Sequence, residues 1–312
     1  MKKFLVHGLT IVVTVVVLLA AFYFLFPEAV FKLTIDAQRR SADLVKKEIQ
    51  VDDHRIVYLE GGTGETGETV ILLHGFGGSK DVWTAFAKYL KGYHLVIPDV
   101  PGFGESSQVS TDSYGVGIQV GRIDRFVEVL KLDKFHMAGN SMGGAITATY
   151  GAKHPEKVMT LALLDTAGAP SQNKSEFIVQ LEKGNNLVLA SNTEDFDKLM
   201  ALIFVKEPSI PSSFKKIIAA DWIAHAEFNK KIWNDLQPLQ FSLAPVLPLI
   251  QSPVLIIWGD QDKLTDVGGV AFLEKNLKNY RTVIIKDTGH APMSEKPEET
   301  ANAYMSFLKE KR

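Results

Sequence analysis

The chain has 312 residues, 34 Lys and Arg against 36 Asp and Glu for a formal net charge of −2, and 46% hydrophobic residues. This length fits one large domain or two small ones, and the balanced charge lacks the basic excess of nucleic-acid-binding proteins, so no nucleic-acid partner is expected. The absence of cysteine excludes disulfides, thiolate metal sites and a cysteine nucleophile.

The chain begins with an apolar run, residues 4–26, that contains no charged side chain. At about 1.5 Å per residue, a helix of this length crosses a bilayer core of about 30 Å. A cleavable signal peptide is the alternative, but the apolar run continues past the weak cleavage candidate at 19–21. We therefore expect residues 1–26 to be a retained, single-pass membrane anchor and the lipid bilayer to be a partner. Cations flank the run on both sides, so the orientation stays open.

Residues 27–50 are expected to be a juxtamembrane segment. Apolar residues such as Phe31 and Ile35 are mixed here with cations such as Arg39 and Lys46. This mixture fits a helix lying on an anionic membrane surface, and a solvated linker helix fits it equally well.

From about residue 51 short β-branched runs alternate with longer helical stretches, which is typical of an α/β domain with a mostly parallel sheet and helices on both faces. We expect this core to comprise residues 51–168 and 253–312. The predicted strands are 55–59, 69–73, 94–97, 135–138, 158–164, 254–258 and 282–285, and the predicted helices are 80–90, 113–131, 142–153, 266–277 and 296–310. The glycine-rich segment 61–68 lacks the Lys-Ser/Thr of a phosphate-binding loop and is interpreted as a hairpin turn.

Residues 169–252 interrupt this alternation. They contain no strand-like run, but amphipathic segments at 176–181, 196–204 and 214–233 are separated by prolines. An all-helical insertion of this kind predicts a cap over the carboxyl edge of the sheet. Its aromatic side chains either line an acyl pocket or pack the cap onto the core.

A G-x-S-x-G pentapeptide, Gly139 to Gly143, stands between a predicted strand and a predicted helix. This is the context of a nucleophile elbow, in which a serine occupies a sharp and strained strand-to-helix turn. The two glycines leave room where a Cβ atom would collide with neighbouring backbone. Ser141 is therefore the candidate nucleophile.

A serine nucleophile requires a base, and eight histidines are available. His290 follows the last predicted strand, so it is expected at the same sheet edge as Ser141. A carboxylate must in turn orient the base, and Asp262, which follows the preceding strand, is the candidate. Asp165 is the rival for this role.

The transition state requires an oxyanion hole. The sequence HGFGG at 74–78 follows a predicted strand and can direct a backbone N–H at the developing oxyanion. We assign the two donors to the N–H groups of Phe76 and Met142. His74 is interpreted as a residue that stabilises this loop by hydrogen bonding.

Five motifs together resemble the α/β-hydrolase superfamily: HGFGG at 74–78, PDVPGFGES at 98–106, GNSMGG at 139–144, WGDQD at 258–262 and TGHAP at 288–292. Their order, with Ser141 first, Asp262 second and His290 third, is the order of that fold. Together with the N-terminal apolar run and the cap, they are similar to membrane-anchored monoacylglycerol lipases and related bacterial lipases. The resemblance implies a serine hydrolase that cleaves medium- or long-chain monoacylglycerols or similar lipid esters. No metal or cofactor is needed for this chemistry, and no obligate protein partner can be inferred from the sequence.

Two other functions stay open. GNSMGG also resembles the serine-dependent hydrolases that cleave carbon–carbon bonds in meta-cleavage products. Those enzymes tend to carry tryptophan directly after the catalytic histidine, whereas Ala291 stands here. The second alternative is a membrane-tethered binding module that has lost catalysis, and the set Ser141, Asp262 and His290 argues against it.

Overall fold

An eight-stranded sheet lies at the centre of the molecule, in the order β1-β2-β4-β3-β5-β6-β7-β8. The computed structural model describes residues 2–237 and 239–311, so Met1, Pro238 and Arg312, which fall in the predicted anchor, cap and core, lie outside the described residues. The strands are β1 (Leu44–Val51), β2 (His54–Gly61), β3 (Thr69–Leu73), β4 (His94–Pro98), β5 (Phe135–Asn140), β6 (Val158–Leu164), β7 (Val254–Gly259) and β8 (Tyr280–Ile285).

The sheet is mostly parallel, as predicted. β1, β2 and β4 pair antiparallel, and the pairs from β4 through β3 to β8 are parallel. All seven predicted strands occur, with ends no more than two residues from those expected. The interpretation of residues 61–68 as a hairpin turn is wrong, because β4 lies between β2 and β3 in the sheet.

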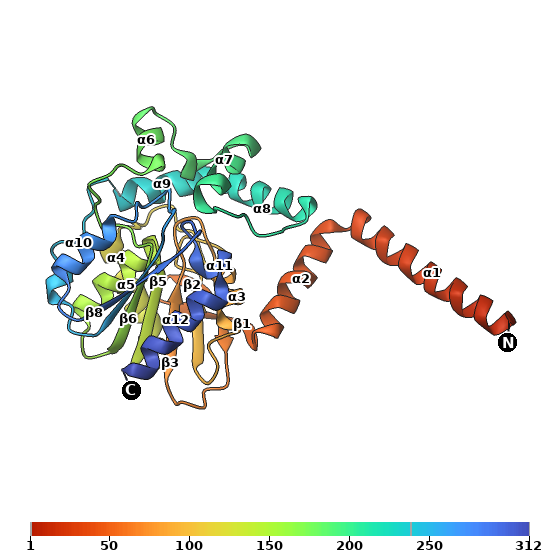
Figure 1. The fold of residues 1–312 in the computed structure, drawn as a ribbon, viewed down its shortest axis with the longest axis horizontal. Helices are drawn as coiled ribbons and strands as arrows, with labels where there is room; N and C mark the ends of the chain where they lie inside the picture. The colour runs from red at the N-terminus through yellow and green to blue at the C-terminus, as the bar shows by residue number, and fades with distance from the viewer. Residues whose placement is uncertain (1, 238, 312) are drawn as a thin grey trace.

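Helices cover both faces of the sheet (Figure 1). On β3, Ile71 and Leu73 belong to a buried cluster with α4 and α5, whereas Val70 and Leu72 belong to a second cluster with α3 and α12. This alternation follows from the two-residue period of a strand and explains why β3 is apolar throughout. The helices of the core are η1 (Lys80–Trp83), α3 (Thr84–Ala87), α4 (Val116–Val129), α5 (Met142–Lys153), α10 (Gly269–Asn276), α11 (Pro292–Glu295) and α12 (Pro297–Glu310).

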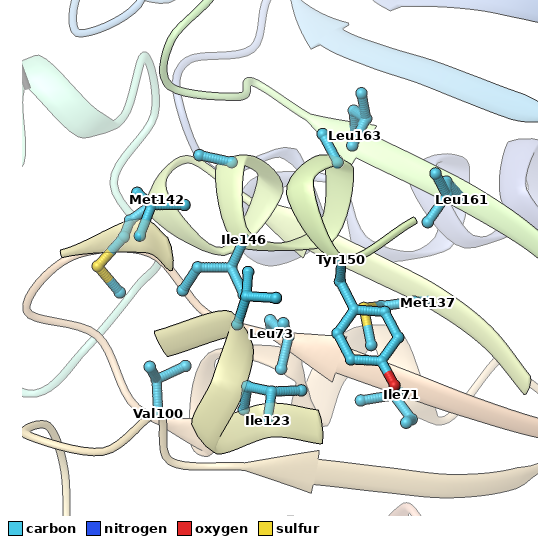
Figure 2. Close-up of a cluster of buried hydrophobic side chains, with 14 of the residues drawn as sticks. Ile71, Leu73, Val100, Ile123, Met137, Met142, Ile146, Tyr150, Leu161 and Leu163 are labelled. Carbon is cyan, nitrogen blue, oxygen red and sulfur yellow. The ribbon is translucent and has the colours of Figure 1, made fainter. Parts of the chain in front are cut away.

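Helix α5, which follows the candidate nucleophile, is anchored by apolar contacts (Figure 2). Ile146 and Tyr150 of this helix lie in one buried cluster with Met137 of β5 and Leu161 and Leu163 of β6, all with exposure of 0%. At about 25 cal/mol per Å² of buried apolar surface, such side chains supply much of the stability of the site's scaffold. The start of α5 is therefore held rigidly against the sheet.

The segment between β6 and β7 is helical and gathers at one end of the sheet (Figure 1). Its elements are α6 (Glu176–Glu182), η2 (Leu187–Leu189), α7 (Thr193–Ile203), α8 (Ser212–Ala224), α9 (Ala226–Leu236) and η3 (Leu247–Leu249). The third amphipathic segment predicted here is two helices, because the chain breaks at His225 between α8 and α9.

At the N-terminus, α1 (Lys2–Leu25) projects away from the sheet and α2 (Pro27–Ser41) returns toward it (Figure 1). Among the described residues, no single helix has the length and apolar character to cross a membrane. Val12–Leu25 and Pro27–Ser41 have the necessary length and apolar character only when taken together, and the two segments are bent by 102° relative to each other. The predicted transmembrane helix therefore stays a prediction.

The juxtamembrane segment is helical over Pro27–Ser41, as both alternatives expected, but it does not remain helical to its end. Its last residues form β1, which pairs with β2 along its whole length. Lys46, Lys47 and Glu48 stand in the middle of this strand, which lies at the edge of the sheet. Charged residues are typical of edge strands, where they discourage pairing with other chains. They also interrupt the apolar pattern by which a strand is predicted from sequence, so β1 was not predicted.

Candidate active site

Ser141 lies between β5 and α5 with φ 55° and ψ −118°. A positive φ is strained for a residue other than glycine, as expected of a nucleophile elbow. A Cβ atom on Gly139 would lie 2.2 Å from the carbonyl oxygen of Gly143, and one on Gly143 would lie 2.3 Å from that of Leu73. The glycines of the pentapeptide are therefore required by the close approach of helix and strands.

The loop after β3 lies against the elbow. A Cβ atom on Gly75 would lie 3.0 Å from that of Ser141. Nε2 of His74 accepts the N–H of Val100 at 2.9 Å, and its Nδ1 donates to the carbonyl of Gly75 at 2.7 Å. Burial lowers the pKa of His74, which keeps the ring neutral as these two bonds require. His74 stabilises the loop, as predicted.

The two amides assigned to the oxyanion hole belong to residues that line the same cavity as Ser141. Met142 is the first residue of α5, where N–H groups have no partner within the helix. Phe76 and Met142 both line the cavity that contains Ser141. Among the described residues, neither N–H donates to a backbone carbonyl in the loops and turns. Both groups are thus suited to bind an oxyanion.

The structure brings His290 and Asp262 together. Nδ1 of His290 lies 2.8 Å from Oδ2 of Asp262, and both residues are buried. Oδ1 of Asp262 accepts the backbone N–H groups of Leu264 and Thr265 at 2.8 and 3.0 Å. The second ring nitrogen of His290 is left for another partner, and His290 lines the same cavity as Ser141.

Two residues that the sequence analysis did not identify hold this pair in place. Oγ1 of Thr265 donates to Oδ2 of Asp262 at 2.7 Å and lies 3.2 Å from Nδ1 of His290. Nδ2 of Asn140 donates to the backbone carbonyl of His290 at 2.9 Å. Asn140 directly precedes Ser141, and this position in the pentapeptide could have identified it from sequence. The position of Thr265, three residues after Asp262, gave none.

Asp165, the rival carboxylate, is next to this pair but does not hydrogen-bond the imidazole. Its Oδ1 accepts the N–H of Gly259 at 2.8 Å. Burial, reinforced by the negative charge of Asp262, raises the pKa of Asp165 well above its usual value. Asp165, Asp262 and His290 also form a cluster of possible metal ligands within 4.8 Å of one another.

A cavity of about 1280 Å³ opens at the site. Such a volume exceeds the usual range of about 300–1,000 Å³ for small-molecule pockets. Aromatic side chains of the cap form part of its wall. The ring centroid of Trp233 lies 5.8 Å from that of Phe76. The edge of Trp222 covers Gly77, since a Cβ atom there would lie 2.1 Å from the indole. The aromatic side chains of the cap thus both line the cavity and pack onto the loop 74–78 that follows β3.

Helix α2 forms another part of this wall. Phe31, Ile35 and Arg39 line the cavity, and the ring of Phe31 lies 5.3 Å from that of Phe214 in α8. The guanidinium of Arg39 binds both carboxylate oxygens of Asp81 at 2.7 Å. The sequence indicated only a juxtamembrane segment here. The contacts of these residues are with residues distant in the chain, and such contacts leave no local pattern.

Comparison with known proteins agrees with this geometry. Residues 68–297 match a family described as the alpha/beta hydrolase fold. Lipase 1 of Psychrobacter immobilis is 35% identical over 276 residues, which cover 88% of this chain and 87% of that lipase. The monoacylglycerol lipase abhd6-B of Xenopus laevis is 31% identical over 320 residues, covering 99% of this chain and 95% of its own.

A solved structure is similar over the whole chain. A membrane phospholipase A, described as a bacterial virulence factor, is 40% identical and superposes with a TM-score of 0.90. The match covers 100% of this chain and 99% of that one. The similarity therefore includes the N-terminal helices as well as the sheet and the cap.

Proposed function

This chain belongs to the α/β-hydrolase family, and we propose that it is a lipase that cleaves the carboxylic esters of lipids through an acyl-enzyme intermediate. The observation that carries the proposal is the arrangement of Ser141 at a strained elbow and His290 bonded to Asp262, around one large cavity. The lipases among its relatives support carboxylic ester hydrolysis.

In this mechanism Oγ of Ser141 attacks the ester carbonyl while His290 accepts its proton. The N–H groups of Phe76 and Met142 stabilise the oxyanion, a contribution of about 2.7–4 kcal/mol for each donor of this kind. His290 then protonates the leaving alcohol. A water molecule, deprotonated by His290, hydrolyses the acyl-serine and releases the fatty acid. Asp262 keeps the imidazole in the required tautomer and stabilises its charged form.

Monoacylglycerols are the proposed substrates. The monoacylglycerol lipase from Xenopus laevis supports this head group, and the cavity accommodates a long acyl chain. Acyl esters of phospholipids are the second candidate, favoured by the 40% identity to a membrane phospholipase A. Both substrates carry the same bond and differ in the group beyond it.

We also propose that the N-terminal run anchors the enzyme to a membrane in a single pass. Residues 4–26 carry no charge, and α1 projects away from the catalytic part of the molecule (Figure 1). The similarity to a membrane phospholipase A, at 40% identity over the whole chain, is further support. An anchored enzyme of this kind takes amphiphilic substrates directly from the bilayer.

The deciding experiment compares kcat/KM for monoacylglycerols of increasing chain length, a phosphatidylcholine, short p-nitrophenyl esters and a meta-cleavage dienoate. We expect the highest value for a medium or long monoacylglycerol with the detergent-purified wild type. Ser141→Ala should abolish all turnover and labelling by a fluorophosphonate probe, whereas Ser191→Ala, an exposed serine of the cap, should change neither.

Each other outcome redirects the proposal. Faster turnover of phosphatidylcholine would favour the phospholipase, and turnover of the dienoate with weak ester activity would favour carbon–carbon cleavage. An unlabelled and inactive wild type would favour a binding module. Activity retained in Ser141→Ala would contradict the assigned nucleophile.

A further inference from the structure

Asp165 is a buried carboxyl group to which the mechanism above gives no role. It follows β6, its exposure is 0%, and its φ of 43° is in the left-handed region. Among residues other than glycine, Asp and Asn adopt this region most readily. A fully buried carboxyl group at a strained position is costly, so it requires a compensating interaction.

The two oxygens of Asp165 have different surroundings. Oδ1 accepts the N–H of Gly259 at 2.8 Å. Oδ2 is buried, and among the described residues no N–H or O–H group donates to it. Its neighbour is the carboxyl group of Asp262, with atoms of Asp165, Asp262 and His290 all within 4.8 Å of one another. Two ionised carboxylates only accept hydrogen bonds, so a bond between them requires a proton on one of them.

The donors present decide which carboxyl group holds that proton. Asp262 receives two backbone N–H groups, the hydroxyl of Thr265 and Nδ1 of His290. Because each of these four groups donates, both oxygens of Asp262 act as acceptors. Asp165 receives one backbone N–H and is completely enclosed, so its neutral form is favoured.

We propose that Asp165 retains its proton at neutral pH and donates it to Asp262, acting as a positioning residue that holds this carboxylate against His290. The inference rests on the proposed function, because it assigns the same three residues to catalysis. An ionised Asp165 would place a second negative charge near His290. That charge would stabilise the imidazolium and make it a weaker acid, whereas a neutral Asp165 has no such effect.

Other groups act in the same direction. Asp262, His290 and Glu295 are the titratable groups that face Asp165. Burial raises the pKa of Asp165, and the charges of Asp262 and Glu295 raise it further. The N–H of Gly259 opposes them but does not outweigh them.

The test is the pH profile of kcat/KM for Asp165→Asn and wild type on a soluble p-nitrophenyl ester. The amide keeps an acceptor for Gly259 and a donor for Asp262 but cannot ionise. We expect the acidic limb of the profile to stay at the wild-type pH. If Asp165 were ionised, the substitution would remove a charge near the imidazole and lower the limb by about 1–3 pH units. A shift of that size overturns the proposal.

A second variant tests the donor itself. Asp165→Ala removes it, and we expect kcat to fall at least about tenfold at unchanged KM, most of it recovered in Asp165→Asn. Asp52→Ala is the matched control, because Asp52 also has a positive φ, 48°, and is exposed in the β1–β2 turn. An unchanged kcat in Asp165→Ala overturns the proposal. If Asp165→Ala does not fold, the pH profile of Asp165→Asn decides.

Labelling of wild type at Ser141 separates the two ideas. A labelled, active enzyme whose acidic limb shifts in Asp165→Asn overturns the role of Asp165 alone. A wild type without labelling or ester turnover overturns the proposed function and this inference together.

Discussion

Thr265 is the residue whose hydroxyl contacts both Asp262 and His290. It donates to the oxygen of Asp262 that also binds His290 and lies within 3.2 Å of the ring nitrogen. Hydrogen bonds to charged groups contribute about 1.5–3 kcal/mol, more than neutral ones. The orientation of Asp262 therefore depends on a side chain outside the catalytic set.

Thr265→Val tests this dependence, because valine has nearly the same shape and no hydroxyl. We expect kcat to fall by about tenfold or more with little change in KM, since the bond is needed most when His290 becomes charged. Steady-state kinetics on a soluble p-nitrophenyl ester measures both constants. Thr265→Ser restores the hydroxyl and should recover most of kcat. Equal kcat in Thr265→Val and wild type would show that Asp262 is held by its other bonds.

At the scale of residues, the sequence predicted those site residues that stand in a recognisable motif beside a predicted strand. Ser141 was identified by glycines on either side, and His290 and Asp262 by their positions after strands. Thr265, Asp165 and Asn140 act through contacts that fold topology creates. For Asp165, sequence left a choice between two carboxyl groups, and the distance of 2.8 Å from Asp262 to the imidazole distinguishes them.

At the scale of elements, an ion network joins α2, β1 and η1. Glu105 accepts hydrogen bonds from Lys46 of β1 at 2.7 Å and from Lys80 of η1 at 2.9 Å. Lys80 is 1% exposed and also binds Asp99 at 2.8 Å. Arg39 of α2 lies 3.6 Å from Glu105. The helix that lines the cavity is thus attached to the core by charge.

This network predicts a pH-dependent stability. Burial opposes the ionisation of Glu105, but the bonds from Lys46 and Lys80 outweigh it and lower the pKa to about 2 from 4.5. A lowered folded-state pKa stabilises the protein above the unfolded value of about 4.5, and this contribution is lost as the pH falls toward 2. The side chain is 45% exposed, so we expect no more than about 1 kcal/mol after screening.

Glu105→Gln should therefore lower the free energy of unfolding at pH 6 and make no difference near pH 2. Urea unfolding of both proteins across this range measures the effect. Glu48→Gln is the control, because Glu48 is 66% exposed and pairs with Arg55 at the surface. A difference that stays constant between pH 6 and pH 3 would contradict the assigned ionisation.

The sequence did not predict strand β1 or the contacts of helix α2, and both depend on partners that are distant in the chain. β1 carries charges in its centre and is fixed by β2, and α2 is fixed by Arg39, Phe31 and their partners in the core and cap. Their local patterns resemble a polar linker. The central strands were predicted within two residues because burial on both faces makes them continuously apolar.

For the whole molecule, the boundary between the proposed anchor and the rest of the enzyme lies near Phe26. Tyr23 of α1 contacts the cap through Phe214, at 6.4 Å between ring centroids, whereas α2 is attached by a partly buried ion pair and lines the cavity. The two helices therefore have different parts in the proposed function. α1 places the enzyme at the bilayer, and α2 belongs to the wall of the substrate cavity.

Two deletions distinguish these parts. Removal of residues 1–26 should release the protein from membranes and leave its kcat on soluble short esters within about twofold of wild type, because the buried contacts of α2 remain. Removal of residues 1–41 should also lower that activity or the thermal stability, since it opens the cavity wall and leaves Asp81 without Arg39. Co-sedimentation with liposomes and esterase assays measure both properties. Membrane binding that survives the shorter deletion would transfer the anchoring role from α1 to α2 and the cap, whose exposed Leu33 and Leu239 would then be the apolar contacts to replace.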